Sequence, residues 1–352
     1  MLKDLCFEII QTCPNNCLFC SSNAGEFCDK IIDFETFKKV IDHLISLGGI
    51  EEISLSGGEP FLHPDIFKMV EYTKSKNIKT VIFTSGIKRS KKISIEEKKY
   101  VNEILEKELR KIEEHEPWNN RLKNNVISFY KRMLEDKEYC SLSNEDIYKL
   151  ENLGLDKIVF DFQASSEEIY NLVMNTKNLY DSLLTSMIKM SRSKINVDIH
   201  FIPMKYNYKL LPDIIEMCNI ANIKNLSLLN FVPQGRGYIN KDKLMMNEDE
   251  LREFVNIYNN CHKSFNGNLR VGIPLISEDT HKCNTGLSKM VIKYDGTVLP
   301  CPAFKEFDVE KLKQYGIKIS NIYDNLDDVK FYKGTIAKPL CKQLYAFKNS
   351  IK

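Results

Sequence analysis

The 352-residue sequence lacks any long hydrophobic run. No stretch approaches the roughly 18 apolar residues that a membrane-spanning helix needs. The first residues, Met-Leu-Lys-Asp-Leu-Cys-Phe-Glu, also lack the apolar region of a signal peptide. We therefore expect a cytoplasmic protein with no membrane partner.

The sequence also lacks an excess of charge of one sign. Its 50 basic and 48 acidic groups give a formal net charge of +2 at pH 7, which offers no electrostatic reason to expect nucleic acid as a partner. With 43% hydrophobic and 28% charged residues, the composition is typical of folded globular proteins and excludes collagen-like or disordered chains. The histidines lie singly, and no His, Asp and Ser set indicates nucleophilic hydrolysis.

Cysteine, by contrast, is abundant. Eleven cysteines in a reducing compartment are not expected to form a disulfide framework. Those that cluster are therefore interpreted first as metal ligands or catalytic groups.

Short runs rich in β-branched and aromatic residues alternate with segments that have apolar residues at helical spacing. This alternation predicts an α/β fold with a parallel sheet and right-handed crossovers. Six strands are predicted, at residues 5–12, 52–56, 80–84, 157–162, 197–203 and 226–233. Six such units favour a partial (β/α)6 TIM-like barrel, with an open doubly wound sheet as the alternative.

The regular spacing breaks between residues 87 and 142, in a charged segment that contains the only tryptophan, Trp118. Its apolar residues have helical spacing, so we expect a two-helix hairpin on the surface, with a lid or a partner-docking arm as the alternative. The strand and helix alternation ends after Gly237. We therefore predict a barrel over residues 1–237, with the helical insertion, and a small C-terminal α+β domain over residues 238–352.

A C-x3-C-x2-C run directly follows the first predicted strand and brings Cys13, Cys17 and Cys20 within eight residues. Zinc sites usually take four protein ligands in a closed tetrahedron, which three cysteines fit poorly. A [4Fe–4S] cluster held by three cysteines leaves one iron free to bind a ligand. The run therefore favours an iron–sulfur cluster with an open iron.

This run, with Phe19 before its last cysteine, resembles the motif of the radical S-adenosylmethionine (radical SAM) superfamily. The second predicted strand ends in Gly57-Gly58-Glu59-Pro60, which is similar to the Gly-Gly-Glu-Pro loop of that family. The resemblance implies a catalytic [4Fe–4S] cluster on the three cysteines and S-adenosylmethionine beside it, with its methionine amino group held by this loop. Glycines let a backbone approach a ligand closely, and Glu59 offers an acceptor for an ammonium group.

Further cofactor-binding candidates lie at the ends of other predicted strands. By resemblance, Ser85 belongs to a turn after the third strand, and Asp161 and Gln163 to a stretch after the fourth whose polar residues contact the ribose or the carboxylate. Arg236 follows the sixth strand, where barrel active sites lie, and a guanidinium there is suited to binding a carboxylate. A solvent-exposed loop charge is the alternative for Arg236.

The last hundred residues contain three more cysteines, Cys283, Cys301 and Cys341. Residues 289–301 predict a hairpin with its turn at Asp295-Gly296, and the pattern resembles the start of the auxiliary-cluster domains called SPASM and twitch. The resemblance implies at most one auxiliary cluster on these cysteines, with structural cysteines as the alternative. Its fourth ligand is open: Cys261, His281, water or the substrate.

The remaining cysteines have no partner spacing and are more often buried small hydrophobic residues. Cys218 and Cys140 are candidates for donating a hydrogen atom to a substrate radical, provided that they face the barrel mouth.

The resemblance implies reductive cleavage of S-adenosylmethionine to a 5′-deoxyadenosyl radical, which abstracts a hydrogen atom from a substrate C–H bond. An electron donor such as flavodoxin or ferredoxin is then an expected partner. We expect the substrate to be a ribosomally made peptide or protein, with oxidation or rearrangement of a small-molecule metabolite as the alternative. A non-enzymatic iron–sulfur or zinc-binding protein is the alternative from another class.

Overall fold

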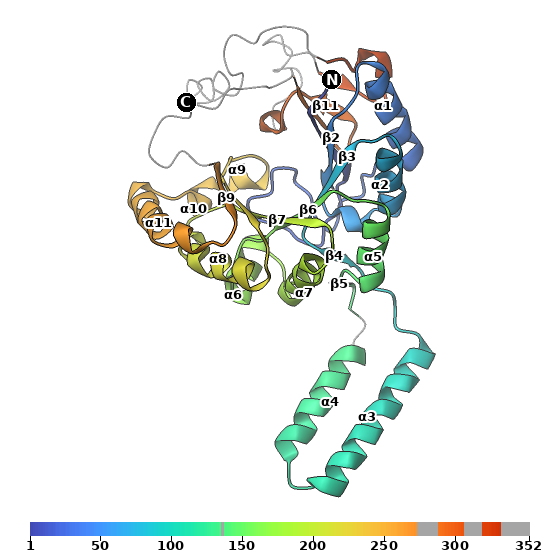
Figure 1. Cartoon of the computed structure of the whole chain (residues 1–352), viewed down its shortest axis with the longest axis vertical. Coiled ribbons are helices and arrows are strands. Elements are labelled where there is room, and N and C mark those ends of the chain that lie inside the picture. Colours follow the sequence, from blue (N-terminus) through green and yellow to red (C-terminus); the bar gives the residue numbers. More distant parts are fainter. Residues whose placement is uncertain (135–136, 273–287, 306–318, 332–352) are drawn as a thin grey trace. The chain divides into compact units, whose positions relative to one another are not determined.

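The computed structural model describes residues 1–134, 137–272, 288–305 and 319–331, which form two compact units (Figure 1). The smaller unit is Lys88–Cys140, and the main unit contains the described residues on either side of it in the sequence. Within these ranges no helix is both long and apolar enough to cross a bilayer.

All six predicted strands are present in the main unit and run parallel in sequence order. Buried side chains such as Phe7, Leu55 and Ile82 explain why these runs are apolar. The six are β1 (Asp4–Ile10), β2 (Glu52–Gly57), β3 (Lys79–Thr84), β6 (Lys157–Asp161), β7 (Asn196–Phe201) and β8 (Asn225–Leu229). The predicted α/β class with a large parallel sheet is thus confirmed.

Strands from the C-terminal part extend this sheet at both ends. β9 (Asn268–Gly272) pairs in parallel with β8, and β10 (Lys289–Ile292) pairs in parallel with β1. β10 forms the predicted hairpin with β11 (Thr297–Leu299), and β12 (Ser320–Asn321) pairs with β11. The hairpin therefore continues the barrel sheet. The boundary after Gly237 stays a prediction, although β9 and β10 join the same sheet as the strands before it.

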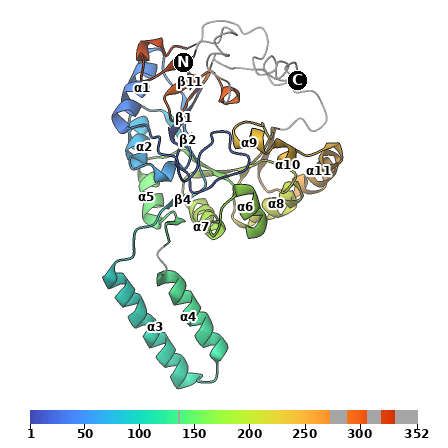
Figure 2. The ribbon, with the colours of Figure 1, turned by 180° about the vertical axis from the view of Figure 1, so that it is seen from behind.

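Helices follow the strands and lie along the outer side of the curved sheet (Figures 1 and 2). α1 shows why they form: its N-cap Asp33 accepts a hydrogen bond from the Thr36 backbone N–H, and Phe37 and Leu44 on its buried face pack inward. The longer ones are α1 (Phe34–Ser46), α2 (Ile66–Ser75), α5 (Asn144–Asn152), α6 (Glu167–Met174), α7 (Tyr180–Ser191), α8 (Leu211–Ile220) and α11 (Glu248–Cys261). Short turns complete the described chain: α9 (Arg236–Ile239), α10 (Lys241–Leu244), and 3-10 turns at Pro60–Leu62, Tyr208–Leu210, His262–Ser264, Pro302–Phe304 and Leu326–Asp328.

The insertion forms the predicted helical hairpin, α3 (Ile95–His115) and α4 (Asn120–Leu134), which pack against each other. A capping box between Ser94 and Glu97 begins α3. β4 (Ile87–Arg89) and β5 (Tyr139–Ser141) pair as a two-stranded sheet where the chain enters and leaves the insertion. Trp118 lies in the turn between the two helices and is exposed.

Candidate functional site

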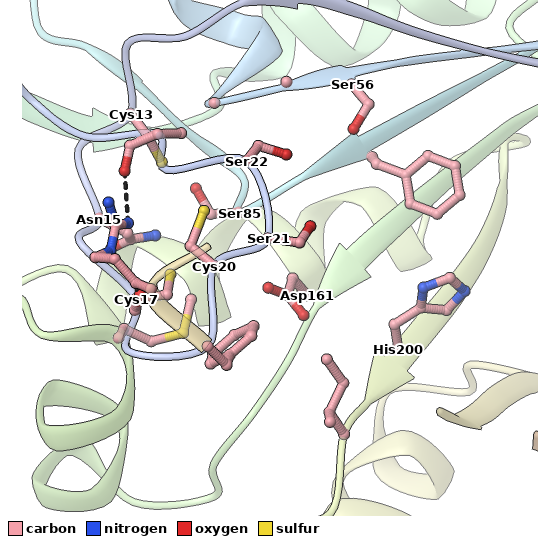
Figure 3. A pocket seen from close by; sticks show the side chains of 18 of the residues that line it. Cys13, Asn15, Cys17, Cys20, Ser21, Ser22, Ser56, Ser85, Asp161 and His200 are labelled. Carbon is pink, nitrogen blue, oxygen red and sulfur yellow. Dashed lines mark hydrogen bonds between the residues drawn. The ribbon is translucent and has the colours of Figure 1, made fainter. Parts of the chain in front are cut away.

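A cavity of about 310 Å³ lies in the main unit at the carboxyl ends of the parallel strands (Figure 3). The loop after β1 forms one wall, and the ends of β2, β3, β6, β7 and β8 form the others. This is the edge at which ligands bind in parallel α/β sheets. The lining includes Cys13, Cys17, Phe19, Cys20, Ser22, Gly57, Gly58, Phe83, Ser85, Asp161, His200, Phe231, Arg236 and Lys305.

The three cysteines of the C-x3-C-x2-C run all line this cavity, as Figure 3 shows. Burial raises the pKa of the Cys13 and Cys17 thiols well above the usual range, so their thiolates need a cationic group to be stable. No three Cys, His, Asp or Glu side chains of the described chain converge on a single metal ion. Thiols spread around one cavity fit a [4Fe–4S] cluster, because each cysteine binds a different iron.

Hydrogen bonds to two other segments of the main unit hold the cysteine loop in place. The Leu18 N–H donates to the Val173 carbonyl of α6 at 2.9 Å. The Arg236 guanidinium donates from Nε to the Cys17 carbonyl at 2.9 Å and from Nη2 to the Ala24 carbonyl at 2.5 Å. Arg236 lines the cavity and uses at least two N–H groups to brace the loop, and its binding of a carboxylate stays a prediction.

Gly57 and Gly58 line the cavity, and their lack of a side chain permits close contacts with the backbone of the protein. A Cβ on Gly57 would overlap with the Ile10 carbonyl, and one on Gly58 would overlap with the Thr12 carbonyl. Gly57 also has a φ of +130°, which side-chain-bearing residues rarely adopt. The glycines let the end of β2 contact the backbone that leads into the cysteine loop, and their close approach to a ligand stays a prediction.

Glu59 and Pro60 are buried and lie outside the cavity lining. The Glu59 carboxylate accepts hydrogen bonds from the Thr84 hydroxyl at 2.6 Å, from the Ser85 N–H and hydroxyl at 2.7 and 2.5 Å, and from the Phe61 N–H at 3.1 Å. These hydrogen bonds use both carboxylate oxygens of Glu59 within the protein, and its contact with a ligand ammonium stays a prediction. Glu59 joins the β2 loop to the end of β3 and fixes Ser85 at the cavity wall.

Asp161 faces the cavity from the end of β6 (Figure 3). Burial raises the pKa of its carboxyl to about 6, although a hydrogen bond from the Gln163 amide opposes this rise. Gln163 lies behind Asp161, and its amide also bonds the His200 carbonyl and the Ile202 N–H. Gln163 is outside the lining and orients Asp161, and its direct contact with the cofactor stays an untested prediction.

His200 lies beside Asp161 on the cavity wall and packs against the ring of Phe83, with the ring centroids 5.3 Å apart. Burial lowers its pKa to about 4, so the imidazole is neutral at pH 7. His200 and Phe83 therefore add uncharged side chains to the cavity wall.

Only two of the cysteines considered for an auxiliary cluster, Cys261 and Cys301, fall within the described residues. Cys283 and Cys341, like His281, lie outside the described residues. Cys301 packs against the buried cluster of Val291, Leu299 and Phe304 near β10. Cys261 ends α11, which contacts α8, the helix before β8, near the other end of the sheet order. Nothing in the described ranges therefore brings Cys261 to Cys301 as a fourth ligand.

The two cysteines considered as hydrogen-atom donors have different surroundings. Cys218 is fully buried in α8 and absent from the cavity lining, and burial raises its pKa to about 12. This placement contradicts the idea that Cys218 faces the barrel mouth. Cys140 belongs to β5 in the smaller unit, and its role stays a prediction.

One cluster at the cavity was missed from the sequence: Lys305, Glu8 and Ser22. The Lys305 ammonium lines the cavity and contacts the Glu8 carboxylate at 2.5 Å. The only available signal was a carboxylate within the apolar strand β1. Its partner is 297 residues away in the sequence, so no local pattern indicates the pair.

Comparison with known proteins bears on the same residues. The family model "Radical SAM superfamily" matches residues 7–113, which include the cysteine loop and the β2 end. PqqA peptide cyclase of Bradyrhizobium diazoefficiens is 21% identical over 340 residues, covering 93% of this chain and 74% of that protein.

Solved structures share the fold at low sequence identity. Streptococcus suis SuiB bound to S-adenosylmethionine has a TM-score of 0.61 at 16% identity, and the match covers 93% of this chain but only 65% of SuiB. Native anSMEcpe with bound AdoMet and Kp18Cys peptide has a TM-score of 0.57 at 15% identity, covering 92% of this chain and 78% of that one. The segment that matches the radical SAM superfamily model, residues 7–113, therefore contains the three cysteines that surround the cavity at the carboxyl ends of the parallel sheet.

Proposed function

We propose that the protein is a radical SAM enzyme that modifies a ribosomally made peptide or protein. The observation that carries the chemistry is the placement of Cys13, Cys17 and Cys20 around one cavity at the carboxyl ends of the strands. The peptide substrate is supported by the relatives: one is named PqqA peptide cyclase, and solved structures include SuiB bound to precursor peptide SuiA.

Cys13, Cys17 and Cys20 would hold a [4Fe–4S] cluster whose open iron takes S-adenosylmethionine. Such a cluster, when reduced and bound, would supply the electron that cleaves the C5′–S bond, which leaves methionine and a 5′-deoxyadenosyl radical able to take a hydrogen atom from a substrate C–H bond. The electron would come from a flavodoxin or ferredoxin in a reducing, cytoplasmic setting.

The chain itself provides position and shielding. Arg236 and the backbone of α6 hold the cysteine loop against the sheet, and Glu59 fixes Ser85 at the wall. Ser85 and Asp161 offer polar groups to the cofactor, while Phe83 and Phe231 supply apolar walls that keep water from a reactive radical.

The test combines cofactor cleavage with substrate modification. The protein is reconstituted anaerobically with iron and sulfide, reduced with dithionite and given S-adenosylmethionine, alone or with short peptides encoded beside its gene. We expect 5′-deoxyadenosine from wild type and none from Cys17→Ala, together with a mass change in one peptide. Cys218→Ala serves as the matched control, because this thiol lies outside the cavity.

Equal results from wild type and Cys17→Ala would exclude the enzyme and leave an iron–sulfur or zinc-binding protein. Abundant 5′-deoxyadenosine with every peptide unchanged would favour a small-molecule substrate instead.

A further inference from the structure

Lys305 and Glu8 form a buried ion pair at the wall of the cysteine cavity. The Lys305 side chain is 8% exposed and that of Glu8 is fully buried, and their charged atoms are 2.5 Å apart. Lys305 Nζ also donates to Ser22 Oγ at 3.0 Å, and Ser22 Oγ donates to the same Glu8 oxygen at 2.5 Å. Ser22 lies two residues after Cys20, so the ion pair is attached directly to the cysteine loop.

The pair has a defined orientation. Phe7 packs against Phe37 of α1 on the outer face of β1, so Glu8, its neighbour in the strand, points to the inner face. Lys305 and Ser22 line the cavity, whereas Glu8 does not. The ammonium therefore lies at the cavity wall, with the carboxylate behind it.

The ammonium keeps its charge in this position. Burial alone would lower the pKa of Lys305, but the adjacent Glu8 carboxylate outweighs burial and holds this pKa above its usual range.

A buried ion pair is a poor means of gaining stability. Removing two charges from water costs about as much as their attraction returns, and apolar residues of similar size often serve as well. Glu8 Oε2, moreover, has no hydrogen-bond partner among the described residues. The pair is thus better explained by an effect of the Lys305 ammonium on the cavity.

We propose that Lys305, held by Glu8 and Ser22, sets the reduction potential of the cluster on Cys13, Cys17 and Cys20. This inference rests on the proposed function. The reduced cluster carries one more negative charge than the oxidised cluster, and an external one-electron donor supplies that electron. A fixed ammonium at the wall of the cavity that the three cysteines line stabilises the reduced form and raises the potential, whereas the Glu8 carboxylate, set further back, partly offsets it.

The experiment measures midpoint potentials of the reconstituted full-length protein by EPR during redox titration with dithionite. The relevant signal is the one that changes when S-adenosylmethionine is added. We expect Lys305→Met to lower the ratio of reduced to oxidised cluster at a fixed potential by about tenfold, which is about 59 mV for a one-electron couple. Glu8→Gln, which keeps shape and removes the opposing charge, should shift the potential upward.

The matched control is Lys74→Met. Lys74 also pairs with a carboxylate, that of Asp156 at 2.6 Å, and Asp156 bonds the Thr80 N–H at the start of β3, at the opposite edge of the sheet from the cavity. This variant should leave the potential unchanged. Shifts of Lys305→Met and Glu8→Gln in the same direction, or no larger than that of the control, would overturn the inference.

Failure of the charge variants to fold does not end the test. If Lys305→Met binds no iron, the upward shift of the near-isosteric Glu8→Gln decides the matter alone. If wild type shows no signal that S-adenosylmethionine changes, the proposed function fails, and this inference fails with it. A normal wild-type signal without charge-dependent shifts removes only the inference.

Discussion

At the scale of single residues, Asp161 lies at the cavity wall, and burial of its ionised carboxylate destabilises the folded protein. Its carboxyl has a pKa of about 6 in the folded protein, against an ordinary value of 3.8, because burial disfavours the charged form. The folded state therefore holds a proton over a pH range in which the unfolded chain has released it. Stability must fall as pH rises from about 4 to about 6.

We accordingly expect the free energy of unfolding of Asp161→Asn at pH 7 to exceed that of wild type. The expected difference is about 2 kcal/mol, which allows for the partial solvent exposure of Asp161. The gain should vanish below about pH 4, where the carboxyl is protonated in both states. Urea unfolding of the cofactor-free protein at pH 7 and pH 4 measures both values. Equal stability of the two proteins at pH 7 would contradict a buried, destabilised carboxylate.

The sequence did not predict contacts between residues that are far apart along the chain. The cysteine spacing predicted a common site because all three cysteines belong to one loop. Glu59 was expected to bind a ligand, yet its acceptors are used by Thr84 and Ser85, 25 and 26 residues later. Only the parallel pairing of β2 with β3 brings these groups together.

At the scale of elements, the end of β2 and the start of the cysteine loop act as one piece. The Gly58 N–H donates to the Ile10 carbonyl at 2.6 Å, and the Glu59 N–H donates to the Thr12 carbonyl at 2.9 Å. Any side chain at position 58 must separate them.

We expect Gly58→Ala to lose about 2–3 kcal/mol of unfolding free energy and to bind less iron, because the new methyl group overlaps with the Thr12 backbone. Gly25→Ala is a matched control in the same loop, since its methyl group would lie 3.4 Å from Asn16 Oδ1. Denaturant unfolding and iron analysis of both variants provide the comparison. Normal iron content in Gly58→Ala would show that the loop tolerates displacement.

Six strands and the helical hairpin were predictable because each carries its own periodic pattern. β9 was not, since its five residues alternate between exposed and half-buried and give no apolar run. The β10 and β11 hairpin was predicted from its turn, but its parallel pairing with β1 was not. Register between strands about 285 residues apart is fixed by tertiary packing rather than by local sequence.

At the scale of the whole molecule, the iron content distinguishes a protein with one cluster from a protein with two. Cys301 lies near β10, and the other predicted auxiliary ligands, Cys283 and Cys341, are outside the described residues. We expect the triple variant Cys13→Ala, Cys17→Ala, Cys20→Ala to retain about four irons on an auxiliary cluster, against about eight in wild type. Iron and sulfide analysis after anaerobic reconstitution gives the count, and Cys218→Ala should match wild type. No iron in the triple variant would remove the auxiliary cluster.

The pairing of β1 with β10 also determines when the site is completed during synthesis. Glu8 and Lys305 are 297 residues apart, which a ribosome covers in roughly 15–60 s at about 5–20 residues per second. Until then β1 lacks one neighbour, and Ser22 lacks both Lys305 and the Tyr294 hydroxyl that donates to its carbonyl. The cysteine loop is translated well before the strands that enclose it, so we expect cluster assembly to follow synthesis of β10 and β11.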